Sequence, residues 1–134
     1  MEERMTKDEL IKLIEELGID KEEFLILSSS ALVFRDLFPN AGDLDMLVTE
    51  KGLNQLKKKY NLKQKENGWY FVNDRCECLL EEKNTWQIEK HEGYNLESLE
   101  KYFAYLKSSN REKDKIRYNI VKEEIEKRKR QLNK

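Results

Sequence analysis

The sequence is poor in the residues that crosslink a chain, break its helices or bind soft metals. Its 134 residues include two cysteines, one histidine, one proline and five glycines. Cys76 and Cys78 lie two residues apart on one expected strand, a spacing unsuited to a bridge between them, so we expect two reduced thiols. No second cysteine pair exists, and His91 stands at no familiar ligand spacing, in an expected exposed loop. The sequence therefore does not predict a zinc site.

Long apolar runs and a large excess of charge of one sign are also missing. No stretch approaches the roughly 20 apolar residues that cross a bilayer, and Met1-Glu2-Glu3-Arg4 leads into no signal-peptide core. The 26 basic and 27 acidic residues leave a formal net charge of -1, so no global field marks a nucleic-acid or membrane binder. We expect a cytoplasmic protein without membrane contact, in which any nucleic-acid contact uses a local patch.

The apolar residues that are present suffice for one thin core. Hydrophobic residues make up 38% of the chain and charged residues 40%, which favours one small domain with a highly charged surface. Helical and extended patterns alternate along the chain without an internal repeat, and they predict an α/β or α+β fold with helices flanking a small mixed sheet. Residues 1–134 are expected to form a single domain, with a sheet-containing core at 1–90 and a C-terminal helical pair at 94–131 packed on it.

Local signals place the elements of the N-terminal half. Thr6 to Glu9 has the form of a capping box, and the helix that it begins is expected to end at Gly18. The other elements expected here are a buried strand at 24–27, a helix at about 29–37, a turn at 38–42 and a second strand at 43–49 beside the first.

The C-terminal half predicts a meander of strands and then two helices. The expected elements are a short helix containing Leu53 and Leu56, strands at 62–65, 69–72 and 75–81, a helix capped by Asn95, and a last helix after Asn110. Asn67-Gly68 is a strong hairpin signal. Trp69, Tyr70 and Phe71 alternate on one strand, so at least one is expected in the core, and an exposed one is a candidate for stacking on a base.

Asp43 and Asp45 form the most informative pair of acids. Side chains alternate on a strand, so the two carboxylates are expected to share a face while Leu44 and Met46 point into the core. Their mutual repulsion is relieved by a cation, and oxygen ligands suit a hard ion such as Mg²⁺ or Mn²⁺. The pair therefore predicts a metal site, and the alternative is an ordinary acidic pair on a surface strand.

Ser28, Ser29 and Ser30 follow the first buried strand and open a helix. Free backbone N–H groups and hydroxyls at such a point form a plausible phosphate cradle. The strand that follows can bring Asp43 and Asp45 towards a phosphate held there. The alternative is that the serines only cap the helix.

Glu77 is the best candidate for a third metal ligand, with Glu81 as second choice. With three acids, two metals about 4 Å apart can activate an attacking hydroxyl and stabilise a leaving pyrophosphate. The alternative is that Glu77 is the solvent-facing member of an alternating strand.

Two stretches of the sequence resemble a known family. Ile26-Leu27-Ser28-Ser29-Ser30-Ala31-Leu32, followed by Asp43-Leu44-Asp45-Met46, is similar to the signature of the polymerase-beta-like nucleotidyltransferases. Residues 94–99, Lys107 and Arg111-Glu112-Lys113-Asp114 resemble the helical motifs of bacterial nucleotidyltransferases of the abortive-infection toxin type. One departure is that the family's turn usually begins with glycine, whereas Ser28 stands here.

The resemblance implies the nucleotidyltransferase fold and a role for each matching residue. It implies metal binding by Asp43 and Asp45, assistance by Glu77, triphosphate binding by the serine turn, and nucleotide-site roles for Lys107 and Asp114. We therefore expect an enzyme that moves a nucleoside monophosphate from a nucleoside triphosphate to a hydroxyl on RNA, protein or a small molecule.

The serine in place of glycine keeps a second function open. This is a catalytically degenerate protein of the same fold, which acts as a binding or regulatory partner in a toxin-antitoxin or phage-defence system. The expected partners are a nucleoside triphosphate, an acceptor such as tRNA or a protein, and a cognate antitoxin or a second copy of the chain.

Overall fold

The computed structural model describes residues 4–132, so the predictions for residues 1–3 and 133–134 lie outside the described part of the chain. The chain divides into two compact units, Met1–Glu97 and Ser98–Lys134. The first unit contains the sheet, and the second contains two helices. The prediction of a single domain with the helices packed on the sheet stays a prediction.

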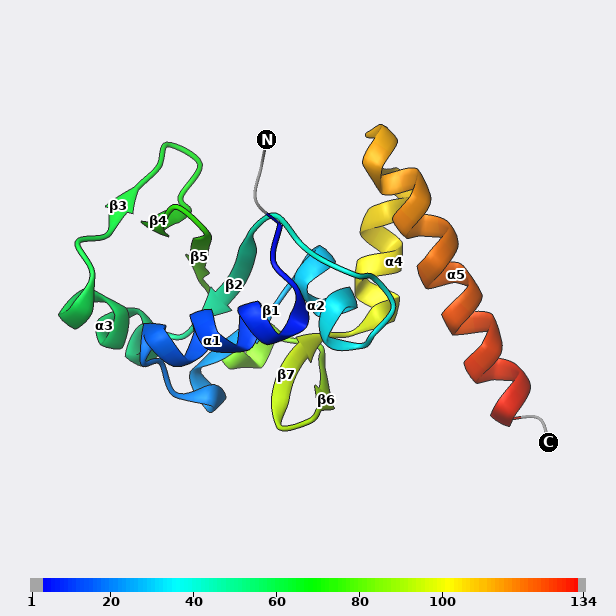
Figure 1. Ribbon diagram of the computed structural model, residues 1–134, viewed down its shortest axis with the longest axis horizontal. Coiled ribbons are helices and arrows are strands. Elements are labelled where there is room, and N and C mark those ends of the chain that lie inside the picture. Colours follow the sequence, from blue (N-terminus) through cyan, green and yellow to red (C-terminus); the bar gives the residue numbers. More distant parts are fainter. Residues whose placement is uncertain (1–3, 133–134) are drawn as a thin grey trace. The chain divides into compact units, whose positions relative to one another are not determined.

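The sheet-containing unit is built on one seven-stranded mixed sheet (Figure 1). The strands are β1 (Phe24–Ile26), β2 (Leu44–Val48), β3 (Lys63–Gln64), β4 (Tyr70–Asn73), β5 (Cys76–Leu80), β6 (Ile88–His91) and β7 (Tyr94–Glu97). Their spatial order is β3-β4-β5-β2-β1-β7-β6, with β3 and β6 at the edges. The pairs β2–β5 and β1–β7 are parallel and the others are antiparallel. The α+β class and the mixed sheet are therefore confirmed, as is the pairing of the first two strands.

Three α-helices belong to this unit: α1 (Lys7–Leu17), α2 (Ser28–Phe34) and α3 (Glu50–Lys59). The predicted capping box at Thr6 is confirmed, because its hydroxyl accepts from the Glu9 N–H while the Glu9 carboxylate accepts from the Thr6 N–H. Gly18 ends α1 in the left-handed conformation, with φ of 69°. Short 3₁₀ turns at Lys21–Glu23 and Lys83–Thr85 complete the unit.

The two faces of the sheet bury apolar side chains to different extents. On one face Leu44, Met46 and Val48 of β2 are fully buried, as predicted, in a large cluster with the inner sides of α1, α2 and α3. On the other face Leu25 and Leu47 are buried beneath Trp86, in a much smaller cluster. Outside this small cluster, the same face carries polar side chains that are half-buried, Asp45 and Glu77 among them.

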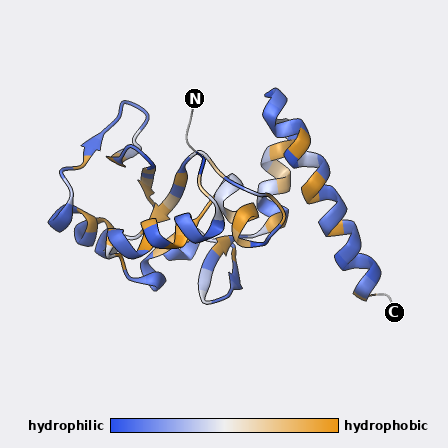
Figure 2. Ribbon diagram, in the orientation of Figure 1, coloured by the Kyte–Doolittle hydropathy of each residue, from blue (hydrophilic) through white to orange (hydrophobic). Residues whose placement is uncertain are grey.

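The C-terminal unit consists of α4 (Leu99–Ser108) and α5 (Glu112–Leu132), which confirms the predicted helical pair. The ring of Phe103 stacks on that of Tyr118, with 5.2 Å between centroids. Helix α5 is largely hydrophilic along its length (Figure 2), and its buried residues are Asp114, Arg117 and Val121. Two of these three are charged, so an ionic network forms part of its packing.

The first helix of this pair exists, but its predicted start after an Asn95 cap is wrong. Residues 94–97 form β7, in which Asn95 is buried and donates its side-chain amide to the Lys21 carbonyl. Helix α4 begins only at Leu99, because Ser98 caps it by accepting from the Lys101 N–H.

The hairpin formed by β6 and β7 is not indicated by the sequence either. It turns at Glu92 and Gly93, both with positive φ, a two-residue turn that lacks the usual Asn-Gly signal. His91 is therefore the half-buried last residue of β6 and not part of an exposed loop.

Gly52 of α3 is expected to be intolerant of any side chain. A Cβ atom there would stand 2.7 Å from the backbone oxygen of Glu23. We expect Gly52→Ala to destabilise the protein by about 1–3 kcal/mol, although alanine favours helix by about 1 kcal/mol. Thermal unfolding measures this, with Asn54→Ala on an exposed position of the same helix as control. Equal midpoints for the two variants would show that the helix moves aside without cost.

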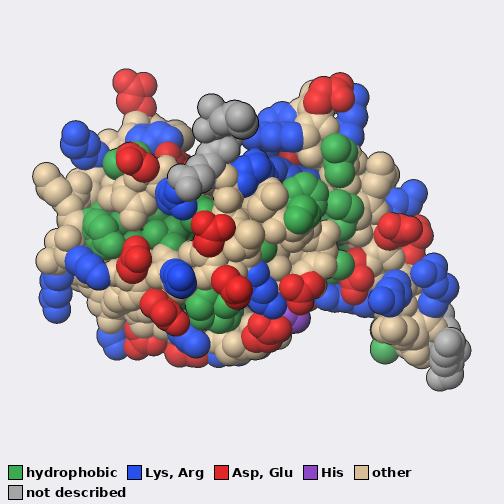
Figure 3. Space-filling model, in the orientation of Figure 1, with side chains coloured by type: hydrophobic (Ala, Val, Ile, Leu, Met, Phe, Trp, Pro, Cys, Tyr) green, Lys and Arg blue, Asp and Glu red, His purple; other side chains and the backbone are tan. Residues whose placement is uncertain are grey.

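No helix among residues 4–132 is both long and apolar enough to span a membrane. Side chains of both signs are interspersed over the face seen in Figure 3, in keeping with the small net charge.

Candidate functional site

Asp45 and Glu77 are brought side by side by the parallel pairing of β2 and β5. The two residues are direct partners in the register of these strands, so their side chains emerge on the same face of the sheet. Together with Asn67 and Trp69 they line an open hollow of about 190 Å³. The flanking residues Leu44, Met46 and Cys78 are fully buried, which fixes the backbone that carries both acids.

Asp43 lies exposed, one residue before β2, and it does not line this hollow. Its backbone is fixed by the serine turn, since the Ser30 hydroxyl donates a 2.6 Å hydrogen bond to the Asp43 carbonyl. The Leu27 N–H donates in the same region to the Asp45 carbonyl, at 3.0 Å. The structure thus places the serine turn beside the two acids. The buried Ser30 hydroxyl is part of that attachment.

Ser28 occupies a strained position at the start of α2. Its φ is 55°, in the left-handed region that glycine tolerates and other residues enter at a cost of order 1 kcal/mol. The Ser28 N–H donates to the Glu97 carboxylate at 3.3 Å. A negative side chain therefore already engages this N–H, while Ser29 is half-buried and follows it on the helix.

Glu77 carries an ion pair of its own. Its carboxylate lies 2.9 Å from the Lys65 ammonium, in a partly exposed pair. Within residues 4–132, Asp43, Asp45 and Glu77 do not converge into a group of three clustered carboxylates. Glu81, the second candidate, lies beyond β5 and accepts from the Thr85 hydroxyl. Of the predicted acids, Asp45 and Glu77 are therefore the two that face one hollow.

One other cluster of acids and a histidine exists in the described residues. Asp36, His91 and Glu92 have ligand atoms within 4.8 Å of one another. The Lys7 ammonium lies 3.4 Å from the Asp36 carboxylate and 3.0 Å from that of Glu92. Hydrogen bonding to Glu92, and then to Asp36, raises the pKa of Lys7 above its usual value. The protonated Lys7 ammonium thus balances the negative charge of the Asp36 and Glu92 carboxylates.

Both cysteines lie behind the acids, on the buried face of β5. Burial raises the pKa of the Cys78 thiol to about 12, and it raises that of Cys76 well above its usual value. Both thiols are free, as predicted, and both are protonated at neutral pH. They therefore do not act as nucleophiles.

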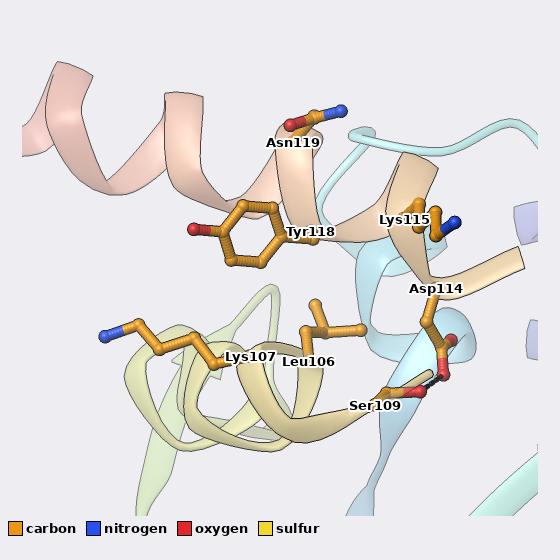
Figure 4. A pocket seen from close by; sticks show the side chains of 7 residues that line it. All are labelled: Leu106, Lys107, Ser109, Asp114, Lys115, Tyr118 and Asn119. Atoms are coloured by element: carbon orange, nitrogen blue, oxygen red, sulfur yellow. Dashed lines mark hydrogen bonds between the residues drawn. The ribbon is translucent and has the colours of Figure 1, made fainter. Parts of the chain in front are cut away.

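The C-terminal unit holds the other two predicted residues. Lys107 of α4 and Asp114 of α5 line a pocket of about 420 Å³ together with Leu106, Ser109, Lys115, Tyr118 and Asn119. Figure 4 shows the two side chains at opposite ends of this lining. The Lys107 ammonium lies over the Phe103 ring, 4.6 Å from its centroid.

Asp114 is buried and saturated with partners. Its carboxylate accepts from the Ser109 hydroxyl at 2.6 Å and from Arg111 Nε at 2.8 Å, and Arg117 donates at 3.3 Å. Burial alone would raise the pKa of Asp114, but the hydrogen bonds from Arg111 and Ser109 and the arginine charges together hold it below its usual value. Within this unit, Asp114 is first of all the centre of an ionic network.

No protein-family model matches this chain, and no curated protein matches it significantly.

Four residues at the site are not predicted as part of it by the sequence. Asn67 and Trp69 line the hollow, Lys65 pairs with Glu77, and Glu97 meets the Ser28 N–H. Asn67 and Trp69 had signals, namely the Asn67-Gly68 hairpin and the alternating aromatic residues that follow it. The pairing of Lys65 with Glu77 depends on the register of the strands. The contact of Glu97 with Ser28 depends on β7, a strand where the sequence predicts a helix.

Proposed function

We propose that this protein is a metal-dependent nucleotidyltransferase of the polymerase-beta-like fold. It would transfer a nucleoside monophosphate from a triphosphate to a hydroxyl group. The observation that carries the proposal is the register that pairs Asp45 with Glu77 over one hollow, beside Asp43 and the serine turn. An antiparallel β1–β2 pair extended by a parallel strand that carries the third acid supports the same fold.

The donor set fits a hard divalent cation. Asp45 and Glu77 offer carboxylate oxygens on one face, with Asp43 two residues from Asp45, and oxygen ligands suit Mg²⁺ or Mn²⁺. Bound metal would supply charge neutralisation at the reacting phosphate. Glu77 can join only if Lys65 gives up its ion pair, and that ammonium would then be available for a phosphate.

The proposed reaction is a single displacement at the α-phosphorus. The acceptor hydroxyl loses its proton to solvent or to a carboxylate of the site, and its oxygen forms a bond to the α-phosphorus. The bond from that phosphorus to the bridging oxygen breaks, and pyrophosphate leaves with the electron pair. Asp43 and Asp45 would hold the phosphate side and Glu77 the acceptor side. The resemblance implies nucleotide-binding roles for Ser28, Ser29, Ser30, Lys107 and Asp114.

A second candidate function is supported by the serine turn itself. The Glu97 carboxylate engages the Ser28 N–H at the place where the resemblance puts a phosphate, and Ser28 is strained where the family has glycine. These observations favour a degenerate protein of the same fold, acting as a regulatory partner in a toxin-antitoxin or phage-defence pair. In that case the acids remain but a triphosphate is not turned over.

A labelling experiment tests the leading proposal. The purified protein is incubated with each α-labelled nucleoside triphosphate, Mg²⁺ or Mn²⁺, and either total RNA or a protein lysate. We expect metal-dependent labelling with at least one triphosphate, and the labelled fraction identifies tRNA or protein as acceptor. Tight metal-dependent binding of any triphosphate would count against the degenerate candidate, and neither binding nor labelling would contradict the leading proposal.

Glu97→Gln tests whether the serine turn belongs to the triphosphate site. If the turn binds phosphate, removing the carboxylate from the Ser28 N–H should lower the Kd for triphosphate about tenfold, the scale of one charge-assisted hydrogen bond. Calorimetry in Mg²⁺ measures the change, with Glu15→Gln on the exposed side of α1 as a control of equal charge. An unchanged Kd would remove the turn from the binding site.

A further inference from the structure

We propose that the edge of the sheet next to the hollow binds single-stranded nucleic acid. This surface, the aromatic edge, consists of Lys63, Lys65, Trp69 and Phe71. The inference goes beyond the proposed function, because strand binding here needs neither the triphosphate nor the metal.

Trp69 and Phe71 turn their rings to the open face of the sheet. They flank Tyr70, which packs against the main core on the opposite face, so alternation places both of their side chains away from it. Phe71 is 37% exposed although its residue type is usually buried, and Trp69 is half-buried at the wall of the hollow. Exposed rings on a sheet face are the elements on which proteins stack successive bases, with little dependence on sequence.

Each ring has a lysine directly across the neighbouring strand. Lys63 is the register partner of Phe71, and the Lys65 N–H donates to the Trp69 carbonyl at 2.7 Å. Both lysines are exposed, and cross-strand partners project on the same face. Basic groups that track a phosphate backbone beside rings that take the bases are the two components of single-strand binding. Charge complementarity therefore favours a nucleic acid over a protein at this edge.

The order of the β-strands also predicts where a bound nucleic acid would end. β3 is an edge strand, so a ligand can approach the lysines from the open side. Moving inwards from β3, the open face presents Phe71, then its register partner Glu77, and then Asp45. Carboxylates repel phosphates, so the bound nucleic acid is expected to end before Glu77. If the proposed transfer occurs, this places the end of the strand on the acceptor side of the acids.

Fluorescence anisotropy of labelled ten-residue oligouridylate and oligothymidylate tests the inference, in EDTA and without triphosphate. We expect both strands to bind, and Trp69→Ala and Phe71→Ala each to weaken binding about fivefold or more, the lower end of stacking effects. Lys63→Gln should lower the salt slope by about 0.7, the value for one phosphate that a lysine no longer neutralises. Adding Lys65→Gln should bring the total to about 1.4 if a bound phosphate displaces Glu77 from the Lys65 ammonium. A preference for one oligomer would identify RNA or DNA as the ligand.

Matched controls keep the result specific. Ile88→Ala removes a similarly exposed apolar side chain from β6 at the opposite edge, and Lys12→Gln with Lys58→Gln removes two exposed helix charges. Circular dichroism and thermal unfolding verify that each variant folds, and Trp69→Phe should retain most of the binding. No anisotropy change up to about 100 μM protein, the weak end of non-specific binding, or equal losses in the controls, would overturn the inference. Asp45→Asn should keep strand binding while losing transfer, so this inference and the proposed function fail independently.

Discussion

Replacing Asp45 by asparagine is expected to lower metal-dependent nucleotide transfer about a thousandfold, or about 4 kcal/mol in transition-state stabilisation. Asp45 is the acid that lines the hollow as the direct register partner of Glu77 and stands two residues after Asp43. Asparagine keeps the shape of the side chain but loses the charge that holds a hard cation. Glu77, the other acid of the hollow, is already paired with the Lys65 ammonium at 2.9 Å, so it is a poor substitute for Asp45. The measurement is the initial rate of label transfer in Mn²⁺, together with Mn²⁺ binding by electron paramagnetic resonance.

Asp74→Asn is the matched control for this substitution. Asp74 is an exposed acid in the turn between β4 and β5, so the change in net charge is identical while the hollow is untouched. We expect its transfer rate and Mn²⁺ affinity to equal those of the unmodified protein. Retention of transfer by Asp45→Asn, with folding verified, would exclude the proposed mechanism.

Replacing Asp114 by alanine is expected to destabilise the C-terminal unit by about 3–5 kcal/mol, the usual cost of breaking a buried ion pair on one side. The Asp114 side chain is 1% exposed, and its loss leaves the largely buried Arg117 guanidinium without this carboxylate. Arg111 and Ser109 lose their acceptor as well. Urea unfolding followed by circular dichroism at 222 nm measures the loss. Glu112→Ala, an exposed acid two residues earlier on α5, should change stability by no more than about 0.5 kcal/mol.

The contribution of Asp114 should also depend on pH with a definite sign. Its folded pKa lies below the ordinary carboxyl value, so the stabilisation is complete above that value and is lost as pH falls through the lower, folded pKa. The difference between the unmodified protein and Asp114→Ala should therefore shrink in strong acid. If Asp114→Ala unfolds at the same urea concentration but loses triphosphate binding, its carboxylate contacts the ligand and its network is secondary.

The local elements of this chain were predictable because their signals are local. The capping box at Thr6, the stop at Gly18 and the hairpin at Asn67-Gly68 each depend on a few adjacent residues, and all three are confirmed. The burial of the apolar residues of β2 was predictable in the same way, because alternation along the strand places them on one face. The prediction of Asn95 as helix cap was wrong because Ser98, three residues later, is also a good capping residue. The Asn95 side chain is buried in β7, and Ser98 caps the helix.

The site was predictable only in part, because register and ion pairs are tertiary properties. Alternation alone identifies Asp45 and Glu77 as acids on sheet faces, but only the parallel β2–β5 pairing makes them neighbours. The ion pair of Glu77 with Lys65 depends on the turn between β3 and β4. The metal, the triphosphate and the acceptor stay predictions, which the labelling and metal-binding experiments test directly.

The parallel pairing of β1 with β7 has a consequence for how the protein is made. Ile26 and Leu96 are partners although nearly the whole sheet-containing unit separates them in sequence. A growing chain can therefore form the β1–β2 pair early, but one side of β1 stays an open, apolar edge until β7 is synthesised. Such an edge is prone to pair with other chains, so slow or interrupted synthesis before residue 97 should favour aggregation. Pairing of β7 with β1 is thus expected to be a late step of folding, and the same step brings Glu97 into contact with the serine turn.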